Sequence, residues 1–139
     1  MQQILIDTSA WVALNDSTDK YHVQSVALLS SLIGHYQLAV TNYILDETYT
    51  LLLVNVGYKA TADFHNDIAK MIASKILHVI WIDQKLADDA WSVFEQFNSD
   101  KARSFTDCVS YAAMKQNNIT EAFSFDHHFA QMGFIKLPT

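Results

Sequence analysis

The sequence is poor in the residues that build disulfide frameworks and that interrupt regular structure. It contains one cysteine, Cys108, and one proline, Pro138. A single cysteine excludes an intrachain disulfide and a cysteine-rich metal site, so we expect a reducing compartment, the cytoplasm. The scarcity of proline, together with the lack of repeats and low-complexity segments, leaves room for helices and strands along the whole chain.

Positive charge is also scarce. Nine Lys and Arg residues stand against 15 Asp and Glu, which gives a formal net charge of −6. This balance argues against a protein that holds nucleic acid by bulk electrostatics, because phosphate binding normally depends on clustered cations. A nucleic-acid partner would need local help, and a metal ion held by carboxylates would supply it by inverting the sign of the local field.

Export and membrane signals are missing from the N-terminal part of the chain. No basic flank precedes the first apolar stretch, and Asp7 interrupts that stretch at once, so neither a signal peptide nor a transit peptide fits. Residues 21–45 carry no formal charge but contain several His, Gln, Ser and Asn side chains, too polar for a membrane span. We expect no membrane association and one globular domain, residues 1–139, since half of these residues are hydrophobic.

The opening stretch of the chain predicts a buried strand that ends in a carboxylate. Residues 4–6 are Ile-Leu-Ile, and Asp7, Thr8 and Ser9 follow. A short run of apolar residues is typical of a parallel strand covered on both faces, and such sheets bind ligands beyond the carboxyl ends of their strands. The alternative is that Asp7 only caps the next turn, a common use of Asp after a strand.

The rest of the chain alternates between the two periodicities. Strands are predicted at 37–40, 77–82, 121–125 and 134–137, and helices at 19–34, 42–57, 61–74, 83–97 and 104–114. Val23 and Val26 are expected on the apolar face of the first of these helices, and Trp91 on the core-facing stripe of the fourth. This order predicts a three-layer α/β/α sandwich around a mainly parallel five-stranded sheet.

Four acids share a placement that capping does not fully explain. Asp7 and Asp126 follow strands, Asp107 lies in the first turn of a helix, and Glu47 lies inside an otherwise apolar helix. Asp46 is the rival of Glu47, since only one of two adjacent helical residues faces the sheet. Four oxygen donors in one place suit Mg²⁺ or Mn²⁺ better than zinc, and such a site is suited to phosphodiester hydrolysis.

Two adjacent histidines follow the last of these acids. His127 and His128 are candidates for ligands or for a general base, but adjacent His at the start of a loop are more often solvent-facing or cap-forming. The sequence leaves their role open.

Four segments in this order resemble the acidic motifs of PIN-domain ribonucleases. They are DTSAWVAL beginning at Asp7, TNYILDE ending at Glu47, SFTD ending at Asp107, and FSFDHHF around Asp126. The resemblance runs from residue 4 to residue 134 and is closest to the toxin ribonucleases of bacterial type II toxin–antitoxin pairs.

The resemblance implies a parallel sheet of order 3-2-1-4-5, with Asp7 on strand 1 beside Asp126 after strand 4. It further implies Mg²⁺ or Mn²⁺ as cofactor, RNA as substrate, a homodimer, and an antitoxin peptide that covers the cleft. By position, Asp7, Glu47, Asp107 and Asp126 become the metal-binding and catalytic residues, and Ser9 an orienting hydroxyl. Lys101 and Arg103, beside Asp107, are the candidates for RNA contact. An RNA-processing nuclease outside a toxin system is the alternative role.

Two other classes of function compete with a nuclease. A phosphate-handling domain, such as a response-regulator receiver or an aspartyl phosphatase, also uses an Asp after a strand. The phosphatase normally has a second Asp where this chain has Ser9, so the sequence disfavours it. A non-catalytic interaction domain of the same fold is the third hypothesis, because function depends on the site and not on the fold.

Overall fold

The computed structural model describes residues 1–97 and 103–139. Strands and helical segments alternate along the chain, as the sequence predicts, with two helices after each of the first three strands in these described residues. In order they are β1 (Gln3–Ile6), α1 (Thr8–Asn15), α2 (His22–Leu32), β2 (Gln37–Thr41), α3 (Asn42–Asn55), α4 (Tyr58–Ala73), β3 (Leu77–Ile80), α5 (Gln84–Phe97), α6 (Phe105–Gln116), β4 (Glu121–Phe123), α7 (His128–Gln131) and β5 (Ile135–Leu137).

The five strands form one sheet in the order β3-β2-β1-β4-β5, which confirms the order implied by the family resemblance. Each strand pairing between described residues is parallel. Strand β1 lies in the centre, and Ile4, Leu5 and Ile6 are fully buried there. The apolar run is therefore required by burial on both faces of the sheet.

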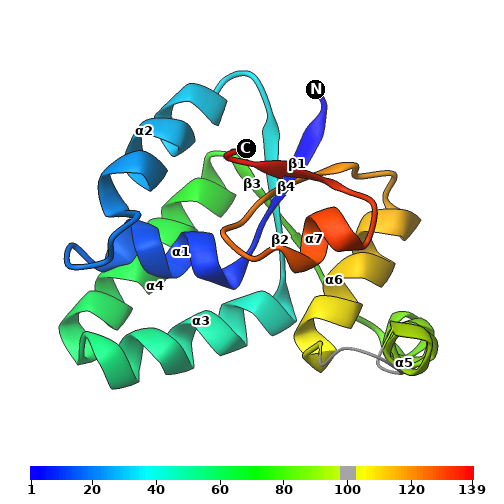
Figure 1. Cartoon of the computed structure of the whole chain (residues 1–139). Helices are drawn as coiled ribbons and strands as arrows, with labels where there is room; N and C mark the ends of the chain where they lie inside the picture. The colour runs from blue at the N-terminus through cyan, green and yellow to red at the C-terminus, as the bar shows by residue number, and fades with distance from the viewer. Residues whose placement is uncertain (98–102) are drawn as a thin grey trace.

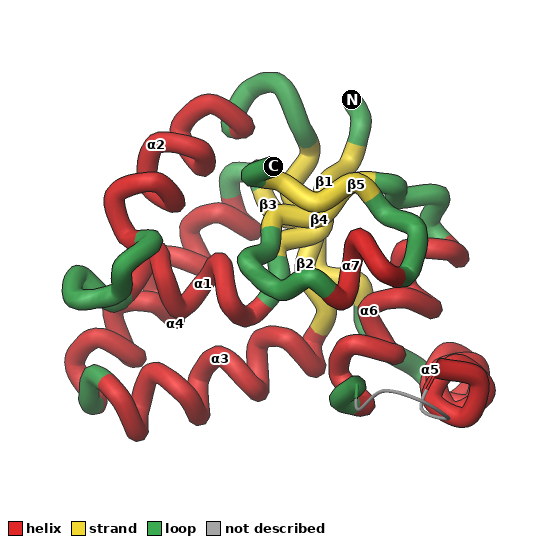
Figure 2. The backbone as a smooth tube through the Cα atoms, viewed as in Figure 1, coloured by secondary structure: helices red, strands yellow, loops and turns green. Residues whose placement is uncertain are grey.

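Helices cover both faces of the sheet, and this arrangement confirms the three-layer sandwich. In Figure 1, α1, α2 and α4 lie on one side of the strands, and the packed pair α5 and α6 lies on the other. Helix α3 follows β2 directly and α1 follows β1 after Asp7, so both helices begin at the edge where these strands end (Figure 2). A ligand beyond the carboxyl ends of the strands would therefore lie close to α1, α3, α6 and α7.

The apolar face predicted for the first long helix is wrong, although the helix itself is confirmed. Val23 is 81% exposed, and Val26 is also exposed, while the small Ser25 is fully buried and Leu32 contacts the core. Trp91 of α5 is exposed as well, stacked on Phe94 at a centroid distance of 5.1 Å. Periodicity identifies a helix, but which of two adjoining stripes meets the core depends on the neighbouring helices.

The ends of two strands also differ from the prediction. Strand β3 ends at Ile80 and β4 ends at Phe123, each two residues early. After β4 the backbone leaves the ladder because the Phe125 N–H donates to the Ser9 hydroxyl. The short helix α7, which the sequence did not predict, follows this turn.

None of the helices in residues 1–97 and 103–139 is long and apolar enough to cross a membrane.

Candidate active site

A cavity of about 550 Å³ opens beyond the carboxyl ends of β1 and β4, at the point where the strand order reverses. This is where a parallel α/β sheet leaves a crevice between neighbouring loops. The residues that line it come from α1 and the residue before it, the α1–α2 loop, α3, the start of α6, the β4–α7 loop and the first residue of α7. They include all four predicted acids and are Asp7, Thr8, Ser9, Val12, Asp19, Tyr21, Glu47, Leu51, Ser104, Asp107, Phe125, Asp126 and His128.

Asp7 is the deepest of the acids, with 4% of its surface exposed. Its Oδ2 accepts hydrogen bonds from the hydroxyls of Ser124 at 2.9 Å and Ser9 at 3.1 Å. Burial, and then the charge of Asp107, nevertheless raise the pKa of Asp7 to about 6 from its ordinary 3.8, while the hydrogen bonds act in the opposite direction. Asp7 has an extended backbone at the N-cap of α1, but its side chain makes no capping hydrogen bond. The carboxylate points into the cavity, so the capping interpretation is wrong.

Two serines connect Asp7 to the loop that carries Asp126. Ser9 Oγ accepts the Phe125 N–H at 3.0 Å, and Ser124 Oγ accepts the Asp126 N–H at 2.9 Å. The sequence predicted Ser9 as an orienting hydroxyl but missed Ser124, which is fully buried. A hydroxyl two residues before an acid, directly after a strand, was the available signal.

Glu47 reaches the same cavity from α3. The buried face of this helix carries Ile44, Thr48 and Leu52, and Glu47 lies beside it, one turn before Leu51, which also lines the cavity. Its neighbour Asp46 is exposed. Of the two adjacent acids between which the sequence did not decide, Glu47 therefore lines the cavity and Asp46 does not.

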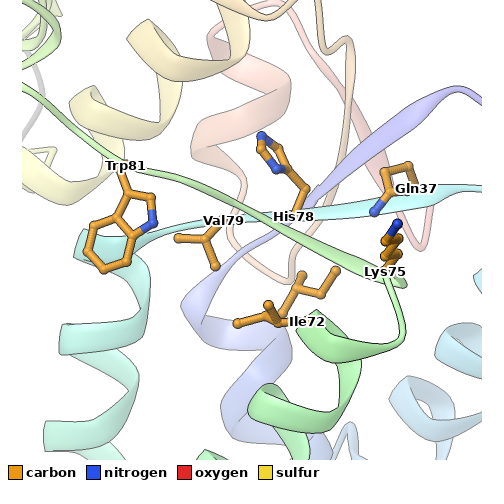
Figure 3. A pocket seen from close by; sticks show the side chains of 7 residues that line it. Gln37, Ile72, Lys75, His78, Val79 and Trp81 are labelled. Carbon is orange, nitrogen blue, oxygen red and sulfur yellow. The ribbon is translucent and has the colours of Figure 1, made fainter.

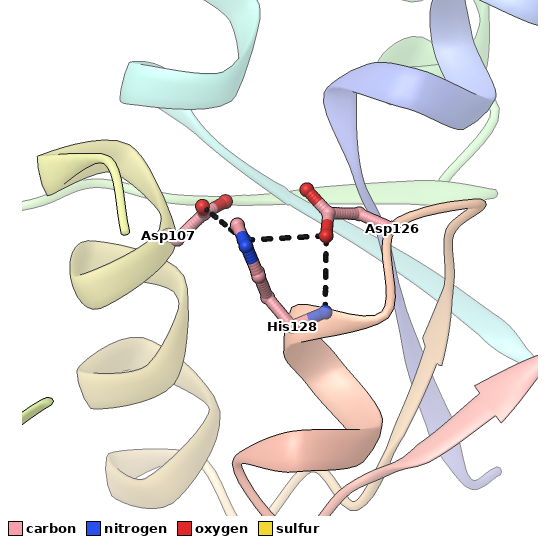
Figure 4. A group of neighbouring side chains, drawn as sticks. All are labelled: Asp107, Asp126 and His128. Atoms are coloured by element: carbon pink, nitrogen blue, oxygen red, sulfur yellow. Dashed lines mark hydrogen bonds and ion pairs between the residues drawn. The ribbon is translucent and has the colours of Figure 1, made fainter. Parts of the chain in front are cut away.

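Asp107 and Asp126 lie on either side of one imidazole ring (Figure 4). His128 Nδ1 lies 2.8 Å from Asp107 Oδ2 and 3.2 Å from Asp126 Oδ1. Asp107 is placed by the cap of α6, where Ser104 Oγ accepts its N–H at 3.1 Å. Asp126 is placed by a tight turn in which its Oδ1 accepts the His128 N–H at 3.0 Å. Of the two histidines, His127 is exposed, whereas His128 contacts both acids.

The donor set suits a divalent cation. One ligand atom each from Asp107, Asp126 and His128 lies within 4.8 Å of the others. Asp7 and Glu47 line the same cavity outside that group of three. No Lys or Arg is among the described residues that line the cavity. The buried carboxylate of Asp7 and the nearby carboxylate of Asp107 therefore have no Lys or Arg in this lining to balance their charge. Carboxylate oxygens are the donors that Mg²⁺ and Mn²⁺ prefer.

Of the two basic residues expected to contact RNA, the structure describes only Arg103. Arg103 is 7% exposed, its Nη2 donates to Gln131 Oε1 at 2.8 Å, and its guanidinium lies 5.6 Å from the Phe97 ring centroid. These contacts hold the segment before α6 against α7 and α5, and the low exposure of Arg103 argues against contact with RNA. Lys101 lies outside the described residues.

A larger cavity, of about 660 Å³, lies along β3, the edge strand of the sheet (Figure 3). It has no Asp or Glu among the described residues that line it, which are Gln37, Ile72, Lys75, Leu77, His78, Val79 and Trp81. Size alone therefore does not identify the site, and the convergence of acids does.

The comparison with protein families gives one match over nearly the whole chain. A model of the PIN domain matches residues 4–135, a span in which all four acids lie. The chain belongs to the PIN domain family. Among PIN proteins, it is 29% identical over 134 residues to the 23S rRNA-specific endonuclease VapC20 of Mycobacterium tuberculosis, covering 96% of this chain and 97% of that protein. It is 31% identical over 128 residues to a VapC ribonuclease of Archaeoglobus fulgidus, covering 91% and 78%.

Solved structures show the same PIN fold. The crystal structure of Mycobacterium tuberculosis VapC20, described as a sarcin-ricin loop cleaving toxin, superposes with a TM-score of 0.83 at 29% identity, covering 95% of this chain and 96% of that chain. The VapBC2 complex of Rickettsia felis superposes with a TM-score of 0.71 at 12% identity, covering 97% of each chain. At that identity the second likeness concerns the fold alone.

Proposed function

We propose that this PIN domain protein is a metal-dependent endoribonuclease that hydrolyses RNA phosphodiester bonds. The observation that carries the proposal is the convergence of Asp7, Glu47, Asp107 and Asp126 on one cavity at the switch point of the sheet. The similarity to proteins named as an rRNA-specific endonuclease and a ribonuclease supports RNA as the substrate class.

The metal ion in this proposal is Mg²⁺ or Mn²⁺, held by the carboxylates of the cavity. Such an ion lowers the pKa of a bound water, orients the scissile phosphate and stabilises the leaving oxygen. Asp107 and Asp126 offer ligand oxygens from α6 and from the loop after β4, and Asp7 and Glu47 add oxygens from α1 and α3.

Several neighbours hold these acids in place. Ser9 and Ser124 fix the Asp7 carboxylate and tie it to the backbone of the β4–α7 loop. His128 contacts Asp107 and Asp126 through one nitrogen, so it fixes the distance between α6 and this loop. Partners of this kind set the orientation of ligands and commonly affect metal affinity by about 10- to 100-fold.

Metal binding is expected to stabilise the wild-type protein strongly and the Glu47→Gln variant weakly. A ligand that binds only the folded state adds stability by mass action, so saturating Mn²⁺ should raise the melting temperature by about 5 to 10 °C. Glu47→Gln keeps the size of the side chain but removes one negative oxygen donor. Thermal melts in chelator and in Mn²⁺ measure the difference.

The matched control is Asp46→Asn, which neutralises the adjacent acid on the exposed side of α3. We expect it to respond to Mn²⁺ like the wild type. Equal metal responses of the wild type and Glu47→Gln would mean that Glu47 does not belong to the site.

We further propose that the protein is the toxin of a toxin–antitoxin pair in the cytoplasm. VapC20, 29% identical to this chain and described as a sarcin-ricin loop cleaving toxin, supports the toxin role. The solved structures of VapBC2 and FitAB, which share the fold, motivate the search for an antitoxin partner. An upstream reading frame for a short DNA-binding protein with a disordered tail would support this role. An RNA-processing nuclease would have no such neighbour.

A homodimer is proposed from the apolar surface where α3 meets α4. Leu53, Val54, Val56 and Tyr58 are all exposed there, and Val54 and Tyr58 are 76% and 77% exposed. A patch of this kind usually marks an interface.

Val54→Lys is expected to shift the protein to a monomer at micromolar concentration, because an interface that buries an unpaired charge loses several kcal/mol, about the energy of a 100-fold change in affinity. Light scattering gives the mass. Val23→Lys on α2, where Val23 is 81% exposed, is the control and should keep the wild-type mass. A monomeric wild type would contradict the dimer.

A further inference from the structure

Two aromatic rings form a flat surface on the rim of the acidic cavity. Tyr21 and Phe125 are stacked with centroids 4.1 Å apart and an interplanar angle of 3°, and both line the cavity together with the four acids. Tyr21 comes from the residue before α2, and Phe125 from the loop after β4. Neither ring is fully buried.

Hydrogen bonds fix the position of this aromatic pair relative to Asp7. The Phe125 N–H donates to Ser9 Oγ, and the same hydroxyl donates to Asp7 Oδ2. The Tyr21 N–H donates to Asp19 Oδ1 at 2.8 Å, and the neighbouring His22 Nδ1 lies 2.8 Å from the carbonyl oxygen of Ala13 in α1. Both rings are therefore held by contacts with α1, the helix that begins directly after Asp7.

A cation lies beside the pair. Lys20 Nζ is 4.9 Å from the centroid of the Tyr21 ring, and Lys20 is exposed. Phe125 stacks on one face of the Tyr21 ring, and Lys20 Nζ lies over the same ring.

The charge balance explains why RNA would need such a surface. The cavity carries five acids and no Lys or Arg among its described lining residues, in a chain of net charge −6. The protein alone therefore attracts the phosphates of RNA only weakly at this cavity. Contacts that do not depend on charge must supply affinity for RNA. Stacking of an unpaired base on an aromatic ring is the contact of this kind that RNA-binding proteins use most.

We propose that Tyr21 and Phe125 form a base-stacking subsite for an unpaired nucleotide next to the scissile phosphate, with Lys20 on the phosphate of that nucleotide. This inference rests on the proposed ribonuclease function and adds to it the residues that hold an unpaired nucleotide beside the acids. Tyr21 is a substrate-positioning residue, and it takes no part in the bond cleavage itself.

The test measures RNA affinity in the full chain carrying Asp7→Asn, so that the RNA stays intact, with Mn²⁺ present. The probe is a fluorescently labelled single-stranded oligoribonucleotide, compared with the same backbone made of abasic nucleotides. Tyr21→Leu keeps an apolar side chain but removes the flat ring, and it is expected to raise the Kd for the base-containing RNA about 10-fold. Tyr21→Trp should bind as tightly as the parent.

The abasic RNA separates stacking from other effects. It should bind the parent and Tyr21→Leu equally, since no base is left to stack. Lys20→Gln should lower the slope of log K against log salt by about 0.7, the value of one phosphate contact on a single strand. Trp81→Leu, which changes an exposed aromatic residue just after β3 that does not line the acidic cavity, is the control and should keep the affinity of the parent.

Two results would overturn the subsite while leaving the ribonuclease intact. One is an unchanged affinity of Tyr21→Leu for the base-containing RNA, and the other is an equal loss of affinity for the abasic RNA. Melting curves of Tyr21→Leu serve to check that the variant is folded. A wild-type protein that cleaves no RNA with Mg²⁺ or Mn²⁺ would instead remove the proposed function, and the subsite with it.

Discussion

Asp7→Asn is expected to reduce metal-dependent RNA cleavage by about 100- to 1,000-fold, the effect of losing several kcal/mol of transition-state stabilisation. Asp7 is the most buried of the four acids and lies beside Asp107. The amide keeps the shape of the side chain and can still accept a hydrogen bond from Ser124 or Ser9, but it carries no charge to balance a cation. The loss should appear in kcat, since Asp7 lies too deep to contribute much to the binding of a large substrate.

Cleavage of a labelled oligoribonucleotide by purified protein, with Mg²⁺, with Mn²⁺ and with chelator, measures this effect. Asp46→Asn is the matched control, because it removes an exposed acid from α3 without touching the cavity. Equal cleavage by the wild type, by Asp7→Asn and by chelated samples would assign the activity to another site or to a contaminant.

The same substitution is expected to stabilise the metal-free protein. Burial and Asp107 raise the pKa of Asp7 from 3.8 to about 6 in the folded state, so folding is opposed by the ionised carboxylate. The folded protein binds more protons than the unfolded chain between these two pKa values. The free energy of unfolding therefore falls as the pH rises through this interval, by up to about 3 kcal/mol at neutral pH. Asn carries no such penalty, although it loses part of the hydrogen bonding from Ser9 and Ser124.

Melting curves in chelator at about pH 7.5 and about pH 5 test this sign. We expect Asp7→Asn to melt about 3 to 9 °C above the wild type at the higher pH, and the gap to shrink at the lower pH, where Asp7 is protonated. Saturating Mn²⁺ should remove the advantage of the variant, because the wild type then gains binding energy that the variant lacks. A variant that melts below the wild type at the higher pH would mean that the hydrogen bonds of Asp7 outweigh the cost of its buried charge.

The site would therefore illustrate a general exchange of stability for function. A carboxylate that destabilises the empty protein is retained because it binds a cation, and one substitution at Asp7 should improve the fold while removing the activity. A residue that was present only to cap α1 would not show this opposition.

Local patterns in the sequence determined most of the fold. The apolar run at residues 4–6 specified the buried central strand, the Ser104 and Asp107 pair specified the start of α6, and Gly57 marked the end of α3, where its φ of +104° disfavours other residues. These signals involve residues close in sequence, so they are legible without the tertiary structure. The order and spacing of the four acids, which carried the family resemblance, are also read directly from the sequence, although these acids lie far apart along the chain.

The sequence alone did not determine what depends on packing between distant elements. Val23 and Val26 fit an apolar helical stripe as well as Leu32 does, and only the position of α2 against α1 decides which side is exposed. In the sequence, Arg103 is a cation close to Asp107. In the structure it contacts Phe97 of α5 and Gln131 of α7.

Only the tertiary structure joined His128 to Asp107 and Ser124 to Asp7, across 21 and 117 positions of the chain. It also stacked Tyr21 on Phe125 at the rim of the cavity. Hydrogen bonds and ring contacts act over a few ångströms, so they depend on how the loops at one edge of the sheet converge, and no periodicity along the chain records that convergence.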